Sequence, residues 1–257
     1  MEKMTRKYYL SSFYVMTFLF SSPLLTLHFI FPSAGKYSVS FTQLAPAFAV
    51  AALALLFKDT TIIKDTRNHF RVDKAAVKWL MPAFAVPAIG IIISSLIMSY
   101  YQVTFVAWEG DTLFYLLNFV AILIGCAAEE IGWRGFLLPN LQKKYTPFSS
   151  SIFVGILWGV WHLNFTAGLL GFVLYTITII EMSILMTWLY NKSDGNLVLM
   201  TVWHFSFNVT SHIFLWDRFT LQLFEVESVV FGILCLFLFV SERNTYFFKS
   251  KQGSIEV

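Results

Sequence analysis

Two glutamates and an arginine interrupt the apolar part of this sequence near its middle. Glu129 and Glu130 follow an apolar run that begins at Leu113, and Arg134 comes four residues after Glu130. An ionisable side chain at the centre of a bilayer costs about 2.5–3.5 kcal/mol on insertion scales, so three of them need partners or a wet cavity. A cluster this unfavourable indicates a functional site.

The spacing of these three residues predicts different roles for the two glutamates. Successive residues of a helix differ by about 100°, so Glu129 and Glu130 point in clearly different directions. Glu130 and Arg134 stand four apart with the acid on the N-terminal side, which is the favourable order for a pair on one face. We therefore expect Glu130 to hold Arg134 while Glu129 faces another group. The alternative is a purely structural ion pair between helices.

Further polar residues are predicted to lie in the same layer of the bundle. His162 ends the segment Trp158-Gly-Val-Trp-His, and His204 and Asn208 share one face of a later apolar segment. At about 1.5 Å per residue, the depths of these segments bring them near the two glutamates, towards the cytoplasmic side. Each histidine has a simpler interpretation as a hydrogen-bonding contact between helices. Convergence of three helices is a stronger signal than any one residue.

This set of residue types suits the hydrolysis of an amide bond. A glutamate and a histidine together can polarise a water as general base, and a histidine with an asparagine can donate hydrogen bonds to a developing oxyanion. Attack by activated water is expected because the cluster has no serine or cysteine nucleophile. Glu129, His162 and His204 are also possible zinc ligands, so a metal-bound water is the alternative. No HExxH pair is present.

Two polar residues nearby stay outside the predicted site. Glu181 either pairs with Arg134 or lines the cavity, and the sequence does not decide between these. His212 follows Asn208 by one turn and is expected near the membrane interface.

The composition indicates an integral membrane protein. Of 257 residues, 57% are hydrophobic and only 13% are charged, which lies outside the range of soluble domains. The apolar runs predict an all-α, polytopic membrane protein with about eight transmembrane helices around an intramembrane catalytic cavity. The expected spans are about 8–31, 41–57, 79–101, 112–138, 148–165, 168–190, 197–216 and 228–240. The first three helices (1–111) precede a catalytic core (112–240) and a basic cytoplasmic tail (241–257).

Loop charges predict the orientation of the chain. The N-terminus, the 58–78 and 139–147 loops and the tail are basic, whereas the 102–111 and 217–227 loops are acidic. By the positive-inside rule, both termini are expected in the cytoplasm of a multi-pass protein, with a bacterial plasma membrane as the expected setting.

Three motifs in order carry a resemblance to a known family: Glu129-Glu130-x-x-x-Arg134, an aromatic residue four positions before His162, and His204-x-x-x-Asn208. They resemble the CPBP family of intramembrane proteases, which includes the type II CAAX prenyl endopeptidases and lysostaphin-resistance-type bacterial proteins. The resemblance covers about residues 112–240.

The resemblance implies a role for each motif. Glu129 would act with His162 to activate water, and Glu130 with Arg134 would support that site. The histidine and asparagine of the third motif would stabilise the oxyanion. Trp158 departs from the family, which usually has Phe there, and this exchange is expected to reshape the pocket without removing chemistry.

The predicted function is therefore an intramembrane endopeptidase. Its substrate would be a membrane-embedded or lipid-anchored protein or peptide, either prenylated at a CAAX-type end or bearing a leader. Partners are the lipid bilayer and this substrate, with no nucleic acid, and zinc is the one cofactor considered. The alternatives are a non-proteolytic membrane scaffold, a bacteriocin-immunity protein or a small transporter, although transporters commonly show paired halves that this sequence lacks.

Overall fold

The computed structural model describes residues 8–30, 41–101, 112–215 and 220–243. These residues form helices and connecting turns, and no strand occurs among them. The elements are α2 (Tyr9–Ile30), η2 (Phe41–Leu44), α3 (Ala45–Leu56), α4 (Thr61–His69), α5 (Lys74–Tyr100), α6 (Thr112–Gly132), η3 (Trp133–Leu137), α7 (Leu138–Gln142), α8 (Pro147–His162), α9 (Gly168–Lys192), α10 (Leu197–Leu215) and α11 (Leu221–Ser241).

Four stretches of the described helices are long and apolar enough to cross a membrane: Ala76–Tyr100, Thr112–Gln142, Gly168–Lys192 and Leu221–Ser241. A shorter apolar helix covers Phe41–Leu56. Large apolar side chains face outward along these helices, as at Leu236 and Phe237 of α11, because lipid rather than water surrounds such a surface. The prediction of an all-helical, polytopic membrane protein is confirmed, and the number of eight spans stays a prediction.

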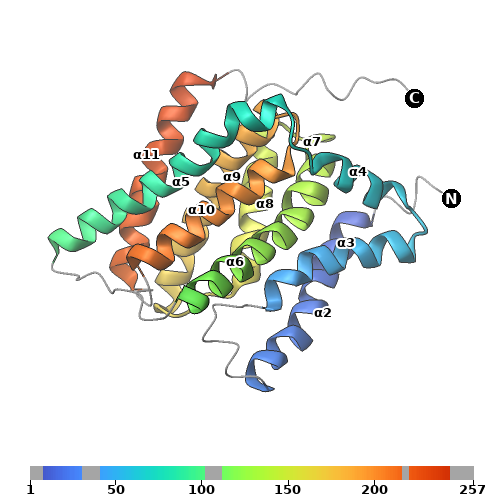
Figure 1. Cartoon of the computed structure of the whole chain (residues 1–257), viewed down its shortest axis with the longest axis horizontal. Helices are drawn as coiled ribbons and strands as arrows, with labels where there is room; N and C mark the ends of the chain where they lie inside the picture. Colours follow the sequence, from blue (N-terminus) through green and yellow to red (C-terminus); the bar gives the residue numbers. More distant parts are fainter. Residues whose placement is uncertain (1–7, 31–40, 102–111, 216–219, 244–257) are drawn as a thin grey trace.

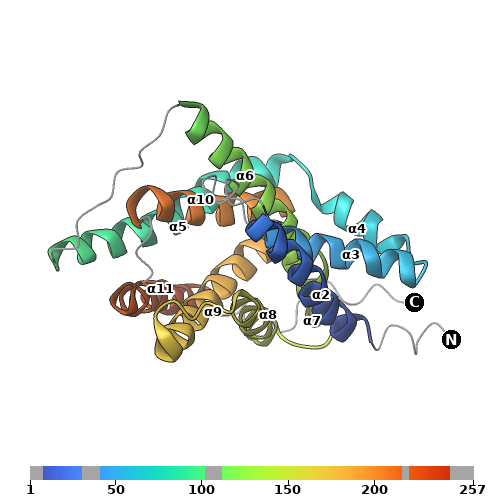
Figure 2. The same ribbon diagram turned by 90° about the horizontal axis from the view of Figure 1, so that it is seen from below.

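The helices pack in two layers (Figures 1 and 2). One layer contains α5, α10, α6 and α3, in which each helix contacts the next. The other contains α11, α9 and α8, again as neighbours, with α2 beside α8. Two hydrogen bonds join α2 and α8: Tyr14 of α2 donates to the Leu157 carbonyl at 3.0 Å, and Trp161 Nε1 of α8 donates to Ser21 Oγ at 2.8 Å. The predicted polar residues lie on α6, α8 and α10, so both layers contribute to the site.

Close approach of α8 and α9 depends on two glycines of α8. A Cβ added to Gly155 would lie 2.5 Å from Ile180 Cα, and one added to Gly159 would lie 3.1 Å from Thr176 Cα. Because neither position can hold a side chain, the two backbones meet directly, as small residues allow in membrane bundles. This contact fixes α8, and with it Trp158 and His162, against the rest of its layer.

Two predicted loops are wrong in part because they contain helix. The 58–78 loop includes α4, whose Ile62 and Thr66 are buried while basic side chains cover its outer face, and the start of α5. The 139–147 loop begins with the end of α7. Hydropathy located the apolar core of each span but not these amphipathic extensions.

The last span is also longer than predicted. α11 begins at Leu221 rather than near residue 228, so the predicted 217–227 loop is wrong over 221–227. Thr220 caps this helix, accepting a hydrogen bond from the Leu223 N–H at 3.2 Å. In the same way Asp73 accepts from the Ala76 N–H at 2.8 Å and starts α5 before its apolar run. The predicted 102–111 loop lies outside the described residues.

The two ends of α8 give a direct test of the predicted orientation. Lys144 and Thr166 are both exposed and lie beyond opposite ends of that helix. A membrane-impermeant thiol reagent applied to intact cells should label Thr166→Cys and leave Lys144→Cys unlabelled, since the basic 139–147 segment is expected inside. Permeabilised cells, in which both should react, provide the control. Labelling of Lys144→Cys alone would reverse the orientation.

Candidate active site

Glu130 is the anionic centre of a buried cluster. Its Oε1 accepts hydrogen bonds from Arg134 Nη1 at 3.1 Å and from His204 Nδ1 at 2.9 Å. Glu130 and Arg134 are fully buried and His204 is 3% exposed. The predicted pairing of Glu130 with Arg134 is confirmed, and His204 of α10 joins it. A charge so deeply buried is tolerated only when it is paired and hydrogen-bonded.

A π-helical turn carries Arg134. The segment η3 follows α6 without a break, and the Leu138 N–H bonds back to the Trp133 carbonyl five residues earlier. Single turns of this type are rare and occur frequently at functional sites. The turn was not predicted, because the sequence around Arg134 contains no local signal for i→i+5 bonding.

Glu129 is equally buried, but both of its hydrogen bonds come from neutral donors. Its Oε2 accepts a hydrogen bond from Trp158 Nε1 at 2.7 Å, and its Oε1 accepts one from Gln43 Nε2 at 3.0 Å. One neutral N–H donor thus holds each oxygen. The two adjacent glutamates therefore differ in environment, as predicted, although Gln43 was not anticipated.

Trp158 contacts most of the cluster at once. Its indole N–H bonds Glu129, and its ring lies 4.3 Å from the guanidinium carbon of Arg134, within the range of a cation–π contact. The ring of His204 approaches its edge at 5.1 Å. A phenylalanine at this position would keep the ring contacts but lose the hydrogen bond to Glu129. The departure at Trp158 therefore adds a donor to the site.

His162 is the last residue of α8 and lies beside the cluster. Its Nδ1 bonds the Trp158 carbonyl at 2.8 Å, and because a carbonyl only accepts, Nδ1 carries the proton. In the neutral ring Nε2 then holds the lone pair. Leu163 follows with a left-handed backbone (φ 48°), which ends the helix at the histidine.

Asn208 extends the contact between α10 and α6 by one turn. Its Nδ2 lies 3.4 Å from Cys126 Sγ, and Cys126 precedes Glu130 by one helical turn. Glu181, in contrast, lies against α11: Cys235 Sγ contacts its carbonyl at 3.4 Å, and a Cβ on Gly232 would meet its carboxylate. The structure thus brings Glu129, Arg134, His162 and His204 into contact with Trp158, and Glu130 bonds two of them. Asn208 lies one turn along α10, against Cys126, and Glu181 lies against α11.

The predicted zinc ligands do not fit a metal ion as they are arranged. Within the described part of the chain, no group of three His, Cys, Asp or Glu side chains converges on one point. The hydrogen bonds of Glu129 go to Trp158 and Gln43, and Nδ1 of His204 bonds Glu130, so these side chains are each held by a different neighbour. The chemistry proposed for this site therefore rests on the side chains of the protein itself.

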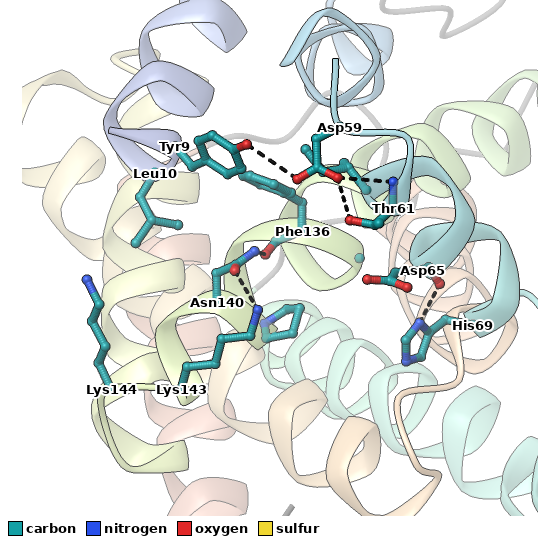
Figure 3. Close-up of a pocket in the computed structure, with 13 residues that line it drawn as sticks. Tyr9, Leu10, Asp59, Thr61, Asp65, His69, Phe136, Asn140, Lys143 and Lys144 are labelled. Carbon is teal, nitrogen blue, oxygen red and sulfur yellow. Dashed lines mark hydrogen bonds between the residues drawn. The ribbon is translucent and has the colours of Figure 1, made fainter. Parts of the chain in front are cut away.

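A cavity of about 480 Å³, lined by both polar and apolar side chains, adjoins the π-helical turn on the side of α4 (Figure 3). Gly135 and Phe136 of η3 line it, together with residues of α2, α4 and α7. On its rim the Tyr9 hydroxyl donates to Asp59 at 3.3 Å. The turn that carries Arg134 is thus bordered by this cavity and by the buried cluster.

Residues 110–210 match the family model of the type II CAAX prenyl endopeptidases described as Rce1-like. The predicted resemblance is confirmed. The matched segment includes all six predicted site residues and excludes Gln43.

Curated relatives agree with this match. CAAX prenyl protease 2 of Methanococcus maripaludis is 24% identical over 140 residues, which cover 50% of this chain and 51% of the relative. Lysostaphin resistance protein A of Staphylococcus haemolyticus is 23% identical over 216 residues, covering 79% of this chain and 58% of the relative. The chain therefore spans about half to three-fifths of the length of the Rce1-like and resistance-type relatives it matches.

Removal of the Arg134 guanidinium should destabilise this buried cluster. Arg134→Ala leaves the buried carboxylate of Glu130 without its strong partner, at a cost of about 3–5 kcal/mol. We expect a lower yield of folded protein and a lower melting temperature in detergent.

Arg67→Ala, which alters an exposed arginine of α4, is the matched control and should melt like the wild type. Glu130→Gln combined with Arg134→Met should recover part of the loss, since no lone charge remains. A normal melting temperature for Arg134→Ala would show that the pair is not structural.

Proposed function

We propose that this chain is an intramembrane endopeptidase that hydrolyses a peptide bond of a membrane-associated protein or peptide with a water activated by Glu129 and His162. The observation that carries the proposal is that two adjacent buried carboxylates have different kinds of hydrogen-bond partner. Glu130 is bonded by Arg134 and His204, whereas Glu129 is held by two neutral donors beside His162. The match to the Rce1-like family supports the same reaction class.

The environment of Glu129 suits a general base. A carboxylate offers about four lone-pair directions, and the bonds from Gln43 and Trp158 use one on each oxygen. The remaining lone pairs can accept a proton from water. In the proposed step water attacks the carbonyl carbon, its proton passes to Glu129, and the proton is later delivered to the leaving amine nitrogen as the C–N bond breaks. His162, with the lone pair of Nε2, would help to orient that water.

His204 and Asn208 are proposed to bind the oxyanion that forms in this step. Because Nδ1 of His204 donates to Glu130, Nε2 is the nitrogen left for the substrate, and a second proton there makes an imidazolium whose charge Glu130 balances. Asn208, one turn along the same helix face, would supply an amide N–H. Donors fixed in a dry site stabilise developing charge strongly, and one such donor is typically worth about 10²–10³ in kcat.

The proposed substrate is a membrane-embedded or lipid-anchored chain, either prenylated at a CAAX-type end or bearing a leader. Two observations support this class: the cluster lies among apolar helices, and one relative bears the name CAAX prenyl protease 2. A resistance role is the second candidate, because lysostaphin resistance protein A matches a larger share of the chain. In either case we propose an integral membrane protein with both termini in the cytoplasm.

The proposed base can be tested by an isosteric change. Glu129→Gln cannot accept a proton from water, so turnover should fall by about 10²–10⁴ while expression and substrate binding stay close to normal. Purified protein would be incubated with prenylated CAAX-type and leader-bearing peptides, and products identified by mass spectrometry.

Glu181→Gln is the matched control, since it neutralises another carboxylate within the bundle that lies against α11. Its turnover should match that of the wild type. Near-normal cleavage by a well-folded Glu129→Gln variant would contradict the assignment of the base.

Chelation tests the zinc alternative at the same site. Because the three predicted ligands do not converge, treatment of the purified protein with a metal chelator should leave turnover unchanged. The measurement is the cleavage rate before chelation, after removal of the chelator, and after addition of zinc. Loss of activity that zinc restores would favour a metal-bound water.

A further inference from the structure

We propose that Gln43 is a positioning residue for Glu129, and that Gly125 provides the space through which its amide reaches the carboxylate. The inference rests on the proposed function, in which Glu129 is the base. Gln43 lies outside the segment that matches the Rce1-like family, and 86 residues separate it from Glu129 in the chain.

The first observation is a row of contacts along one face of α6. Gly125, Glu129 and Gly132 are spaced at i, i+4 and i+7, so they share that face. Gly125 lies against the side chain of Gln43, Glu129 accepts its hydrogen bond, and Gly132 lies against Pro46. The short η2 turn and the start of α3 therefore pack against the face of α6 that carries the Glu129 carboxylate.

The Gln43 side chain occupies the space that a side chain at position 125 would fill. A Cβ added to Gly125 would lie 2.8 Å from Gln43 Cδ and 3.2 Å from Nε2, closer than such atoms pack. The contact is with the amide group itself and not with the backbone of a neighbouring helix. The absence of a side chain at Gly125 thus serves this one hydrogen bond.

The second observation concerns the start of α3. Pro46 stands in the first turn of that helix, where its fixed φ suits helical geometry, and it is buried with Ala45. Pro46 Cα would lie 3.1 Å from a Cβ on Gly132, so the backbone after Gln43 is closely packed on α6. Packing on both sides of Gln43 limits the conformations from which its amide can act.

A neutral amide suits the proposed role better than a cation. Hydrogen bonds from Gln43 and Trp158, one to each oxygen, restrain rotation of the Glu129 carboxylate. A lysine or arginine would orient it too, but an opposite charge stabilises the carboxylate more strongly and makes it a weaker base. Glu130, which has the opposite arrangement, is bonded by a guanidinium.

The test combines a double-variant cycle with kinetics on the full chain, using the same prenylated CAAX-type and leader-bearing peptides as probes. Gln43→Ala and Gly125→Ala should each lower kcat by about 10- to 100-fold, the loss expected for a hydrogen bond to a charged group. KM should change little, because neither residue touches the substrate. Gly125→Ala should cost nothing further in the Gln43→Ala background, where the space is free.

Two variants keep this test decisive. Gln43→Leu keeps the volume of the side chain without the N–H, so it should lose kcat even though it preserves packing. Gln142→Ala, which alters a glutamine of α7 outside the site, should retain the wild-type kcat. A melting-temperature cycle of the same variants measures the coupling of Gln43 with Gly125 without any substrate.

The outcomes separate the two proposals. If Glu129→Gln is inactive but Gln43→Leu turns over like the wild type, Gln43 does not position the base and the inference is overturned. Additive losses of melting temperature for Gln43→Ala and Gly125→Ala would overturn the claim about Gly125. Full activity of Glu129→Gln would instead overturn the proposed function, and the positioning role with it.

Discussion

The rest of the structure depends on one constraint: two carboxylates on consecutive residues of one helix are both buried and both need hydrogen-bond donors. Burying an unpaired carboxylate is very unfavourable, and two side by side also repel each other. The structure gives each a separate set of donors: Arg134 and His204 for Glu130, and two neutral N–H groups for Glu129. Trp158 joins the two sets, since its N–H bonds one glutamate while its ring faces the cation that holds the other.

This arrangement makes the N-terminal helices part of the site. A division at residue 111 separates Gln43 from the carboxylate that it bonds, and α2 from the two hydrogen bonds that hold α8. The helix α3 packs on α6 and α10 packs on α5. The segment that matches the Rce1-like family therefore carries the reactive groups, whereas part of what orients them lies before it.

Much of the site followed from local features of the sequence. The pairing of Glu130 with Arg134 is an i, i+4 relation within one helix, and the convergence of His204 on it could be estimated from depth along two spans. Gln43 had no such signal, because a short turn 86 residues away is placed only by tertiary packing. The π-helical turn at Arg134 was missed because the sequence around it contains no local signal for i→i+5 bonding.

The fold shows a similar division. Apolar runs predicted the helices, since a bilayer requires backbone groups to be satisfied within each span. Where a helix begins is decided by single capping residues, such as Asp73 and Thr220, which lie outside the apolar run. Polar capping residues and amphipathic turns have a low mean hydropathy. For this reason α4 and the first turns of α11 were assigned to loops.

Charge balance within the cluster bears on how it would act. With both histidines neutral, the two glutamates and Arg134 carry a net charge of −1, which opposes the formation of a further anion on the substrate. In the proposed reaction, a proton on Nε2 of His204 would bring that sum to zero, beside the Glu130 Oε1 that bonds both His204 and Arg134. The same carboxylate would then support a cationic donor towards the oxyanion, while Glu129, whose two hydrogen bonds come from neutral groups, is the proposed acceptor of the proton from water. The unequal partners of two adjacent glutamates thus place the proposed base and the partner of the proposed cationic donor, His204 of α10, on one turn of α6.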